Sequence, residues 1–276
     1  MGLGDEIKGV TFVPLEVTTD DASLIDGVYD YAVTDRYIYV LPVKEPRIVL
    51  FDRQGRFIRT LVKEGQGPGE FRGILPCIQV DERNDRLFLF SNNRVWEYTL
   101  EGEFIGQSTH EYSVIYMRHI GKDRFAAISF PFQPFNGGGF GLGLFSRKGD
   151  TIAIKNDFYS FLLPHEKSGF TTSIAPAYSD AQNSVLFKTG SNDTVFCISA
   201  DRISAACVLD LKNSDAEVIR SLDVTDMSNL RIEKKDPKDI FVQDMIEFPG
   251  HYYFRLLYNQ GYYIASVDKK TGKTLV

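Results

Sequence analysis

Cysteine is scarce in this sequence. Only Cys77, Cys197 and Cys207 occur in 276 residues, and no two of them form a Cys-x-x-Cys pair. An odd and widely spaced set of this kind does not build a disulfide framework. Two alternatives remain: Cys197 and Cys207 could bridge adjacent strands, or all three are buried free thiols, and the second is the ordinary behaviour of sparse cysteines.

Long hydrophobic runs are missing as well. No apolar stretch reaches the ~18–20 residues that a transmembrane helix requires. The first residues, Met1 to Glu6, lack the charged-then-apolar pattern of a signal peptide. We therefore expect no transmembrane segment and no signal peptide in this chain. The protein is either cytoplasmic or the mature form of an exported protein whose signal has been removed.

Clustered positive charge is also absent. The chain carries 31 Lys and Arg against 37 Asp and Glu, for a net charge of −6, and the cations are scattered. Binding of DNA or RNA needs grouped cations that displace counterions from phosphates. Anionic membrane surfaces make the same demand. Nucleic acid is therefore excluded as a partner, whereas cations, neutral sugars and peptides remain open.

Recognisable catalytic and metal-binding motifs are lacking too. The four histidines show no His-x-His or His-Glu-x-x-His spacing, so a zinc site has no support. They are His110, His119, His165 and His251. No Gly-x-Ser-x-Gly elbow occurs, and no cysteine can be nominated as a nucleophile. From the residues alone we predict no metal and no cofactor, and no catalytic residue can be nominated.

What the sequence does contain is a repeat of strand-forming segments. The 14 Tyr and 21 Phe suit pleated, half-buried surfaces. Residues 35–61 and 85–107 share an Asp-Arg pair, an alternating apolar run, a short loop and a glycine turn before Phe-Ile. The turn glycines Gly55, Gly102 and Gly149 recur at a constant interval. Four antiparallel strands at this spacing are typical of propeller blades, whereas a β-sandwich has no reason to repeat so regularly.

The repeat predicts an all-β fold, a β-propeller of four-stranded antiparallel blades in a single domain covering 1–276. Five units are visible, and they cover residues 26–62, 74–109, 113–156, 173–210 and 241–276. The stretch from Ser214 to Glu217 reads as a capping box and predicts one short helix near 215–223. A strand over 10–15 precedes the first unit and is expected to close the ring by joining the last blade.

The stretch KEGQGPGEFRGILP, residues 63–76, concentrates glycine and proline between the first two units. A dinucleotide or phosphate loop would need a third glycine where Glu70 stands, followed by a helix, and neither is present. The stretch instead serves as a joint between blades. Its glycines permit unusual dihedrals, Pro68 stiffens it, and Phe71 is placed to plug the gap between the blades.

The same joint carries a family resemblance. The segment GQGPGEFRGILPCIQVDERNDRLFLFSNNRVWEYTLEGEFI resembles an NHL-type repeat, and with FVPLEVTTDDASLIDGV before it the chain resembles the six-bladed, NHL/TolB-like β-propellers of Bacteroides-type bacteria. The resemblance implies six blades, an exported and often lipid-anchored protein, and a function that is uncharacterised. Ser91 stands where NHL repeats have an Asp. Five visible units leave open a five-bladed closure or a sixth, degenerate or absent blade.

Two places are candidates for ligand binding. Propellers bind at the axial mouth, where inter-blade loops converge, which nominates Gln66, Glu70 and Arg72. Arg47 and Arg94 hold equivalent positions in their units and serve either as inter-blade posts or as ligand contacts. The stretch FPFQPFNGGGFGLG, residues 130–143, sets aromatic residues among glycines and could form an apolar lip for a sugar or peptide. Its candidates are Phe132, Phe135 and Asn136.

These observations favour a non-catalytic binding or scaffolding propeller of the bacterial cell envelope, periplasmic or anchored to the outer membrane, that recognises a protein or glycan partner. The alternative is a Ca²⁺-dependent hydrolase or lyase, lactonase-like, with its site at the axial mouth. That alternative requires several oxygen ligands that converge on one cation.

Overall fold

The computed structural model shows an all-β chain. It describes residues 11–20, 22–72, 77–91, 93–111, 114–129, 141–155, 177–181, 183–188, 193–211, 214, 240–259 and 261–276. Every regular element within these residues is a β-strand, and no helix occurs among them. The chain divides into two compact units, Met1–Ser108 and Thr109–Val276.

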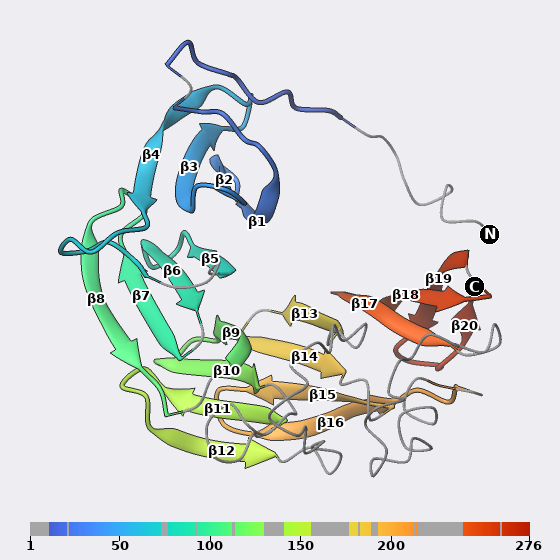
Figure 1. Cartoon of the computed structure of the whole chain (residues 1–276). Coiled ribbons are helices and arrows are strands. Elements are labelled where there is room, and N and C mark those ends of the chain that lie inside the picture. The colour runs from blue at the N-terminus through green and yellow to red at the C-terminus, as the bar shows by residue number, and fades with distance from the viewer. Residues whose placement is uncertain are drawn as a thin grey trace, which may run out of the picture. The chain divides into compact units, whose positions relative to one another are not determined.

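Unit 1 holds two four-stranded sheets, blade 1 and blade 2 (Figure 1). Blade 1 consists of β1 (Val28–Val33), β2 (Tyr37–Pro42), β3 (Arg47–Asp52) and β4 (Phe57–Lys63). Blade 2 consists of β5 (Cys77–Asp81), β6 (Arg86–Ser91), β7 (Arg94–Tyr98) and β8 (Phe104–Thr109), whose last residue begins unit 2.

Unit 2 holds three further four-stranded sheets. Blade 3 consists of β9 (Val114–His119), β10 (Arg124–Ser129), β11 (Leu142–Ser146) and β12 (Thr151–Lys155). Blade 4 consists of β13 (Ala177–Ala181), β14 (Ser184–Lys188), β15 (Thr194–Ser199) and β16 (Ile203–Val208). Blade 5 consists of β17 (Phe241–Phe248), β18 (His251–Tyr258), β19 (Gly261–Asp268) and β20 (Thr274–Leu275).

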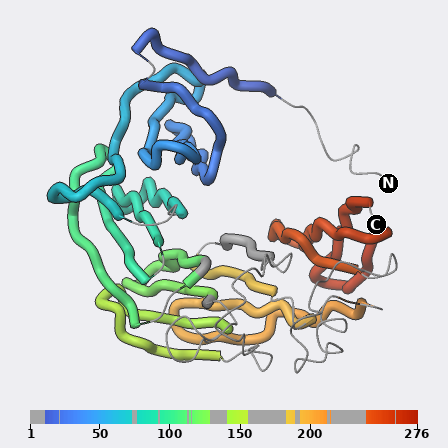
Figure 2. Tube along the Cα trace, viewed as in Figure 1, coloured from blue at the N-terminus to red at the C-terminus, as the bar shows by residue number. Residues whose placement is uncertain are grey.

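Strands that follow one another in the chain are neighbours in every sheet, as the colour sequence along the tube in Figure 2 shows. This up-and-down order confirms the predicted fold class, a β-propeller of four-stranded antiparallel blades. The described residues form five blades, so the predicted six-blade count is not confirmed, and the single domain stays a prediction. The helix predicted near 215–223 lies outside the described residues.

The hairpin turns contain glycine at the positions that the sequence predicts. The turn glycines in the motifs RQGR, LEGE, RKGD and KTGK all have positive φ angles: 82° at Gly55, 87° at Gly102, 100° at Gly149 and 69° at Gly272. At Gly149 a second constraint applies, because a Cβ atom there would lie 2.5 Å from the carbonyl oxygen of Thr109. A side chain at this position would meet both backbone strain and a clash.

The core of unit 1 lies between its two sheets. Alternate residues of β2 and β3, such as Tyr39 and Leu50, form one buried cluster with residues of β6 and β7, such as Leu89 and Trp96. The other face of blade 1 holds a smaller cluster that includes Phe51. This division follows from the two-residue period of a strand, which sends successive side chains to opposite faces.

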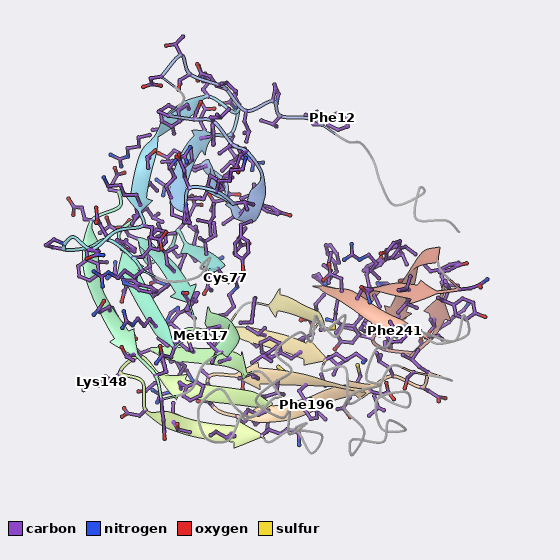
Figure 3. The ribbon with its side chains drawn as sticks, in the orientation of Figure 1. Phe12, Cys77, Met117, Lys148, Phe196 and Phe241 are labelled. Atoms are coloured by element: carbon purple, nitrogen blue, oxygen red, sulfur yellow. The ribbon has the colours of Figure 1, made fainter. Side chains whose placement is uncertain are left out.

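Unit 2 is built in the same way, with one apolar cluster between each pair of neighbouring blades. Residues such as Leu144 of β11 and Phe187 of β14 join blade 3 to blade 4. On the other face of blade 4, Val195 packs with Met245 and Phe254 of blade 5. Figure 3 shows side chains along blades 4 and 5, among them Phe196 of blade 4 and Phe241 of blade 5.

The strand predicted over 10–15 is not formed in the part that the structure describes, because residues 11–18 contain no strand. They lie along blade 1 instead. Leu15 packs against the cluster around Phe51, and the Glu16 amide donates to the Gly55 carbonyl at 2.8 Å. Turn glycine Gly55 leaves room for this approach, since a Cβ on it would lie 2.0 Å from the Pro14 carbonyl oxygen.

Candidate functional site

The glycine-rich joint is held together by its own polar groups. The Glu70 carboxylate accepts a hydrogen bond from the Gly67 amide at 2.7 Å. The Arg72 guanidinium donates to the Gly65 carbonyl at 3.2 Å. Glu70 and Arg72 therefore shape the loop, whereas Gln66 is exposed beside them. A ligand contact by any of the three stays a prediction.

Phe71 confirms the structural role predicted for this joint. Its side chain is fully buried, in the cluster that joins blades 1 and 2. Its ring meets Trp96 edge to face, with 6.4 Å between the ring centroids. Such aromatic pairs add to the stabilisation that burial of apolar area provides. The loop thus inserts an aromatic plug between two sheets.

Arg47 and Arg94 begin the third strand of their blades but differ in their surroundings. The Arg47 side chain is only 14% exposed, and its guanidinium donates to the Leu24 carbonyl at 2.8 Å and to the Glu45 carboxylate at 2.9 Å. It fastens the segment that leads into β1. Arg94 is exposed opposite Ser91 in the β6–β7 hairpin. The two arginines are therefore equivalent only in their position at the start of the third strand, and not in their contacts.

The second candidate region, residues 130–143, lies mostly outside the described residues. Phe132, Phe135 and Asn136 are among the residues not described, as is His165. Their proposed contact with a sugar or peptide stays a prediction.

His110 is a buried titratable group of unit 2. Its side chain is 2% exposed and lies edge to face with Phe125 and Phe145, at centroid distances of 5.9 and 5.5 Å. Burial in this aromatic setting penalises the charged form and lowers the pKa of His110 to about 4. The imidazole is therefore neutral at physiological pH.

The described residues contain neither a metal-binding cluster nor a membrane-spanning helix. Nowhere in them do three or more His, Cys, Asp or Glu side chains come close enough to share a metal ion. Within the same residues, no helix has the length and apolar character needed to cross a membrane.

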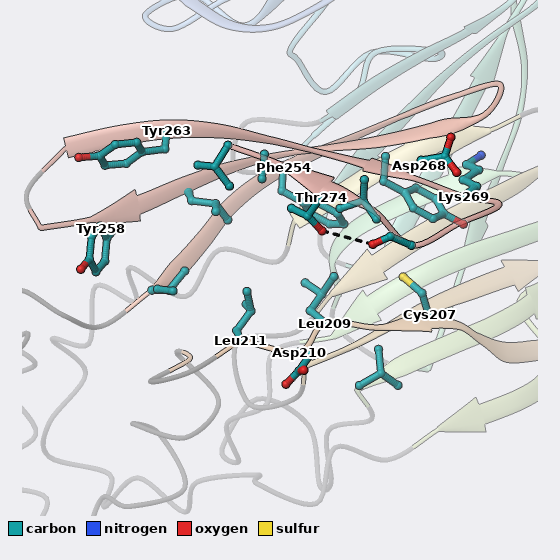
Figure 4. A pocket seen from close by; sticks show the side chains of 18 residues that line it. Cys207, Leu209, Asp210, Leu211, Phe254, Tyr258, Tyr263, Asp268, Lys269 and Thr274 are labelled. Carbon is teal, nitrogen blue, oxygen red and sulfur yellow. Dashed lines mark hydrogen bonds between the residues drawn. The ribbon is translucent and has the colours of Figure 1, made fainter. Parts of the chain in front are cut away.

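An apolar groove of about 620 Å³ lies between blades 4 and 5 in unit 2 (Figure 4). One wall is the end of β16 and the residues after it, including Leu209 and Leu211. The other wall is one face of blade 5, where Phe254, Tyr258 and Tyr263 line the groove. A volume of this size is in the range of ligand pockets, roughly 300–1,000 Å³.

The register of blade 5 explains why its aromatic side chains gather there. Phe254 lies opposite Ala265, and Leu256 lies opposite Tyr263, in the β18–β19 pair. Residues that are directly opposite share a face of the sheet, and the period of two brings every second residue to the same face. Tyr258 and Tyr263 meet at one end of the groove, with 6.0 Å between ring centroids.

Polar groups at the other end of the groove are mostly engaged within blade 5. The Asp268 carboxylate accepts hydrogen bonds from the Thr271 amide at 2.7 Å and hydroxyl at 2.8 Å, and the amide bond is the main cause of its lowered pKa. Lys269 pairs with Glu247 and lies 4.6 Å from the centre of the Tyr252 ring.

Asp210 differs from these groups. It is exposed on the opposite wall of the groove, in the stretch that follows β16 (Figure 4). No hydrogen bond or ion pair joins it to the residues that the structure describes. Asp210 therefore offers negative charge to an incoming molecule.

The three cysteines are free thiols, as one of the two alternatives predicts, but each is half-buried rather than fully buried. Cys197 lies opposite Ser204, and Cys207 lies opposite Val195, so the two cysteines are not facing partners in the β15–β16 pair. Cys207 lines the groove. Burial raises the pKa of the Cys207 thiol, which keeps it protonated and a weak nucleophile.

Sequence reasoning missed this groove. Its signal was present in the fifth repeat, where HYYFRLLYNQGYYIASVD sets Tyr252, Phe254, Leu256 and Tyr258 at every second position. Those residues read only as strand formers, because the sequence does not say which face of a blade is left open.

The fold and groove place the chain in a class: β-propellers of antiparallel blades with an apolar crevice between two blades. More specifically, a family model matches residues 2–276, and the chain belongs to that family, described as Domain of unknown function (DUF4934). No curated protein matches the chain.

Solved structures show the same fold at low sequence identity. A protein of Bacteroides fragilis NCTC 9343, whose name describes it as exported, is 18% identical with a TM-score of 0.70, over 94% of this chain and 73% of that one. A member of the DUF4221 family from Bacteroides vulgatus ATCC 8482 is 9% identical with a TM-score of 0.57, over 91% of this chain and 80% of that one. Identities this low show the fold alone.

Proposed function

We propose that this protein is a non-catalytic binding or scaffolding propeller of the bacterial cell envelope that recognises a protein or glycan partner. The groove between blades 4 and 5 carries the proposal. Tyrosine and phenylalanine side chains line it, and tyrosine combines a large apolar ring with a hydroxyl that can hydrogen-bond. Such surfaces are enriched where proteins bind partners.

The envelope location is supported by resemblance. The B. fragilis neighbour is described by its name as exported. An envelope protein of this kind would reach the periplasm through a signal that is later removed, and a lipid anchor would hold it at the outer membrane. Descent from a six-bladed, NHL/TolB-like propeller belongs to the same proposal.

Site-specific photo-crosslinking in cells tests the function. A photoreactive phenylalanine analogue replaces Val208, which lines the groove and is 70% exposed. The matched control places the analogue at Ile152, which is 42% exposed and does not line the groove. We expect one dominant crosslinked species, recovered from the envelope fraction, at position 208 only.

Two results would contradict the proposed function. One is crosslinking that is equal at both positions or absent from both. The other is turnover of lactone, ester or glycoside substrates by the purified protein at rates of roughly 1 s⁻¹ or more, as enzymes show.

A further inference from the structure

The groove wall that faces blade 5 is fastened to blade 4 through one aspartate. The Leu209 amide donates to the Asp193 carbonyl at 2.9 Å. The Asp193 carboxylate accepts a hydrogen bond from the Ser214 hydroxyl at 2.8 Å, and Ser214 forms a parallel bridge with Ile240. Leu209, Leu211 and Ile240 all line the groove. Asp193 thus connects the stretch after β16 with the residue that leads into β17.

Asp193 belongs to a buried polar cluster, the Asp193 cluster, which consists of Lys188, Asp193 and Ser214. Ser214 is fully buried. The Lys188 side chain is 1% exposed, and its Nζ atom lies 4.0 Å from Oδ1 of Asp193. A buried ion pair adds little net stability compared with apolar side chains of the same size. Stability alone therefore does not account for three polar side chains at this place.

Blade 1 has the same backbone hydrogen bond with apolar residues in place of the charged pair. There the Glu64 amide, just after β4, donates to the Pro46 carbonyl, just before β3, at 2.9 Å. In blade 4, Asp193 holds the place of Pro46. At the end of the second strand, Lys188 holds the place of Pro42. The backbone bond is thus part of the blade geometry, whereas the charged pair is an addition in the blade that borders the groove.

The stretch that this cluster fastens carries the apolar side chains of the wall. Leu209 and Leu211 point towards blade 5 (Figure 4). With Ile240 they are partly buried against the apolar cluster that includes Phe254. A molecule in the groove contacts the aliphatic wall of blade 4 on one side and the aromatic wall of blade 5 on the other. Its fit therefore depends on where the blade 4 wall is held.

We propose that Asp193 is a positioning residue of the binding groove. Through the Ser214 hydroxyl it holds the apolar wall of blade 4 in the arrangement that a partner contacts, and Lys188 keeps its carboxylate in place. A wall that is held in its bound arrangement beforehand loses less conformational entropy when the partner binds. This inference rests on the proposed binding function and assigns the residues that preorganise the groove.

Crosslinking in cells from position 208 gives the first readout. Ser214→Ala removes the hydroxyl that Asp193 accepts but leaves the ion pair in place. We expect the yield of the groove-specific crosslink to fall about tenfold, which corresponds to one hydrogen bond to a charged group. Ser204→Ala is the matched control, at a serine of β16 that does not line the groove, and it should crosslink as the wild type does.

Two substitutions of Asp193 separate positioning from stability. Asp193→Asn keeps an oxygen that accepts from Ser214 but removes the negative charge beside Lys188. We expect it to retain most of the crosslink while urea denaturation shows a clear loss of stability. Asp193→Ala removes the acceptor as well, so both the crosslink and the stability should fall. A purely structural role would instead make the crosslink follow stability in both variants.

Hydrogen exchange in the purified whole protein reports on the wall directly. The Leu209 amide is protected by its bond to the Asp193 carbonyl. In Ser214→Ala we expect this amide to exchange about tenfold faster, because the wall opens locally without unfolding of the blade. The amides of β15 should exchange as in the wild type.

Several outcomes would overturn the inference. Ser214→Ala could crosslink as strongly as Ser204→Ala, Asp193→Asn could lose the crosslink as fully as Asp193→Ala, or the Leu209 amide could exchange at its wild-type rate in Ser214→Ala. If Asp193→Ala fails to fold, the two serine variants decide the matter, since neither of them alters the ion pair.

The failure of this inference is distinguishable from failure of the proposed function. If Ser214→Ala still gives the same groove-specific crosslink in cells, the function stands and the positioning role of Asp193 is wrong. If the wild-type protein gives no groove-specific crosslink, the function itself is wrong.

Discussion

At the scale of single residues, Phe71 is the side chain in which sequence and packing agree most closely. The glycine-rich joint delivers it between two sheets, where it is fully buried against the only tryptophan of the chain. Its neighbours in the stretch, Glu70 and Arg72, form hydrogen bonds to backbone groups of the same loop. The polar residues that were candidates for ligand binding, Glu70 and Arg72, thus hold the loop that positions the apolar Phe71.

Replacement of Phe71 by alanine should destabilise unit 1. We expect a loss of about 3–5 kcal/mol in the free energy of unfolding, because a large aromatic side chain leaves a cavity between two sheets. Fluorescence of Trp96 during urea denaturation reports the change, since its ring contacts Phe71. Phe12→Ala is the matched control, at a side chain that is 89% exposed (Figure 3). Equal losses in the two variants would contradict the plug.

His110 should make the stability of unit 2 depend on pH. Its pKa in the folded protein is about 4, below the value of about 6.5 for an exposed histidine. The unfolded chain therefore binds the proton more readily than the folded protein does. The contribution of His110 to the free energy of unfolding is fully present above about pH 6.5 and is lost as the pH falls towards 4. The loss approaches roughly 3 kcal/mol.

The measurement compares denaturation of the wild type and of His110→Phe, followed by circular dichroism between pH 7 and pH 4. The phenylalanine variant cannot take up this proton, so its stability should fall less steeply over that window. An unchanged slope in His110→Phe would count against the buried, neutral imidazole.

At the scale of elements, the hairpin turns follow local chemistry. All four turn glycines singled out in the repeats adopt positive φ angles, because a tight turn between antiparallel strands requires a conformation that other residues avoid. The turns also meet neighbouring segments, which no local rule predicts. Gly149 approaches the Thr109 carbonyl, whereas Gly250 has open space around it.

This contrast gives a matched pair of substitutions in unit 2. Both glycines have positive φ, 100° at Gly149 and 93° at Gly250. Gly250→Ala should therefore cost only the conformational strain, about 1–2 kcal/mol. Gly149→Ala should cost more, because its Cβ would also lie 2.5 Å from a backbone oxygen. Scanning calorimetry measures both, and a loss for Gly149→Ala no larger than that for Gly250→Ala would contradict the close approach.

The N-terminal stretch is an element that the sequence misassigned. The sequence predicts a strand over 10–15, yet residues 11–18 contain none. Leu15 packs against blade 1, and the Glu16 carboxylate accepts a hydrogen bond from the Phe57 amide at 2.8 Å. Phe12 in the same stretch is 89% exposed, and a strand also needs a pairing partner, which a sequence pattern cannot supply.

At the scale of the whole molecule, the charge composition indicates which classes of partner the protein can bind. The net charge of −6 and the scattered cations predict that the protein does not bind duplex DNA. Fluorescence anisotropy of a labelled duplex at low salt, where electrostatic binding is strongest, should show no association. Binding that weakens as salt is added would contradict this expectation.

The sequence by itself determined the fold class, the positions of the hairpin turns and the plug at Phe71, because each depends on local chemistry: two-residue periodicity, glycine dihedrals and one large apolar side chain in a short loop. Only the tertiary structure decided which sheet faces are covered, that Glu70 and Arg72 bond within their own loop, and that the tyrosines of blade 5 border a groove. Those features depend on which surfaces meet, and residues far apart in the chain, such as Leu209 and Tyr263, are brought to one groove only by packing of whole sheets.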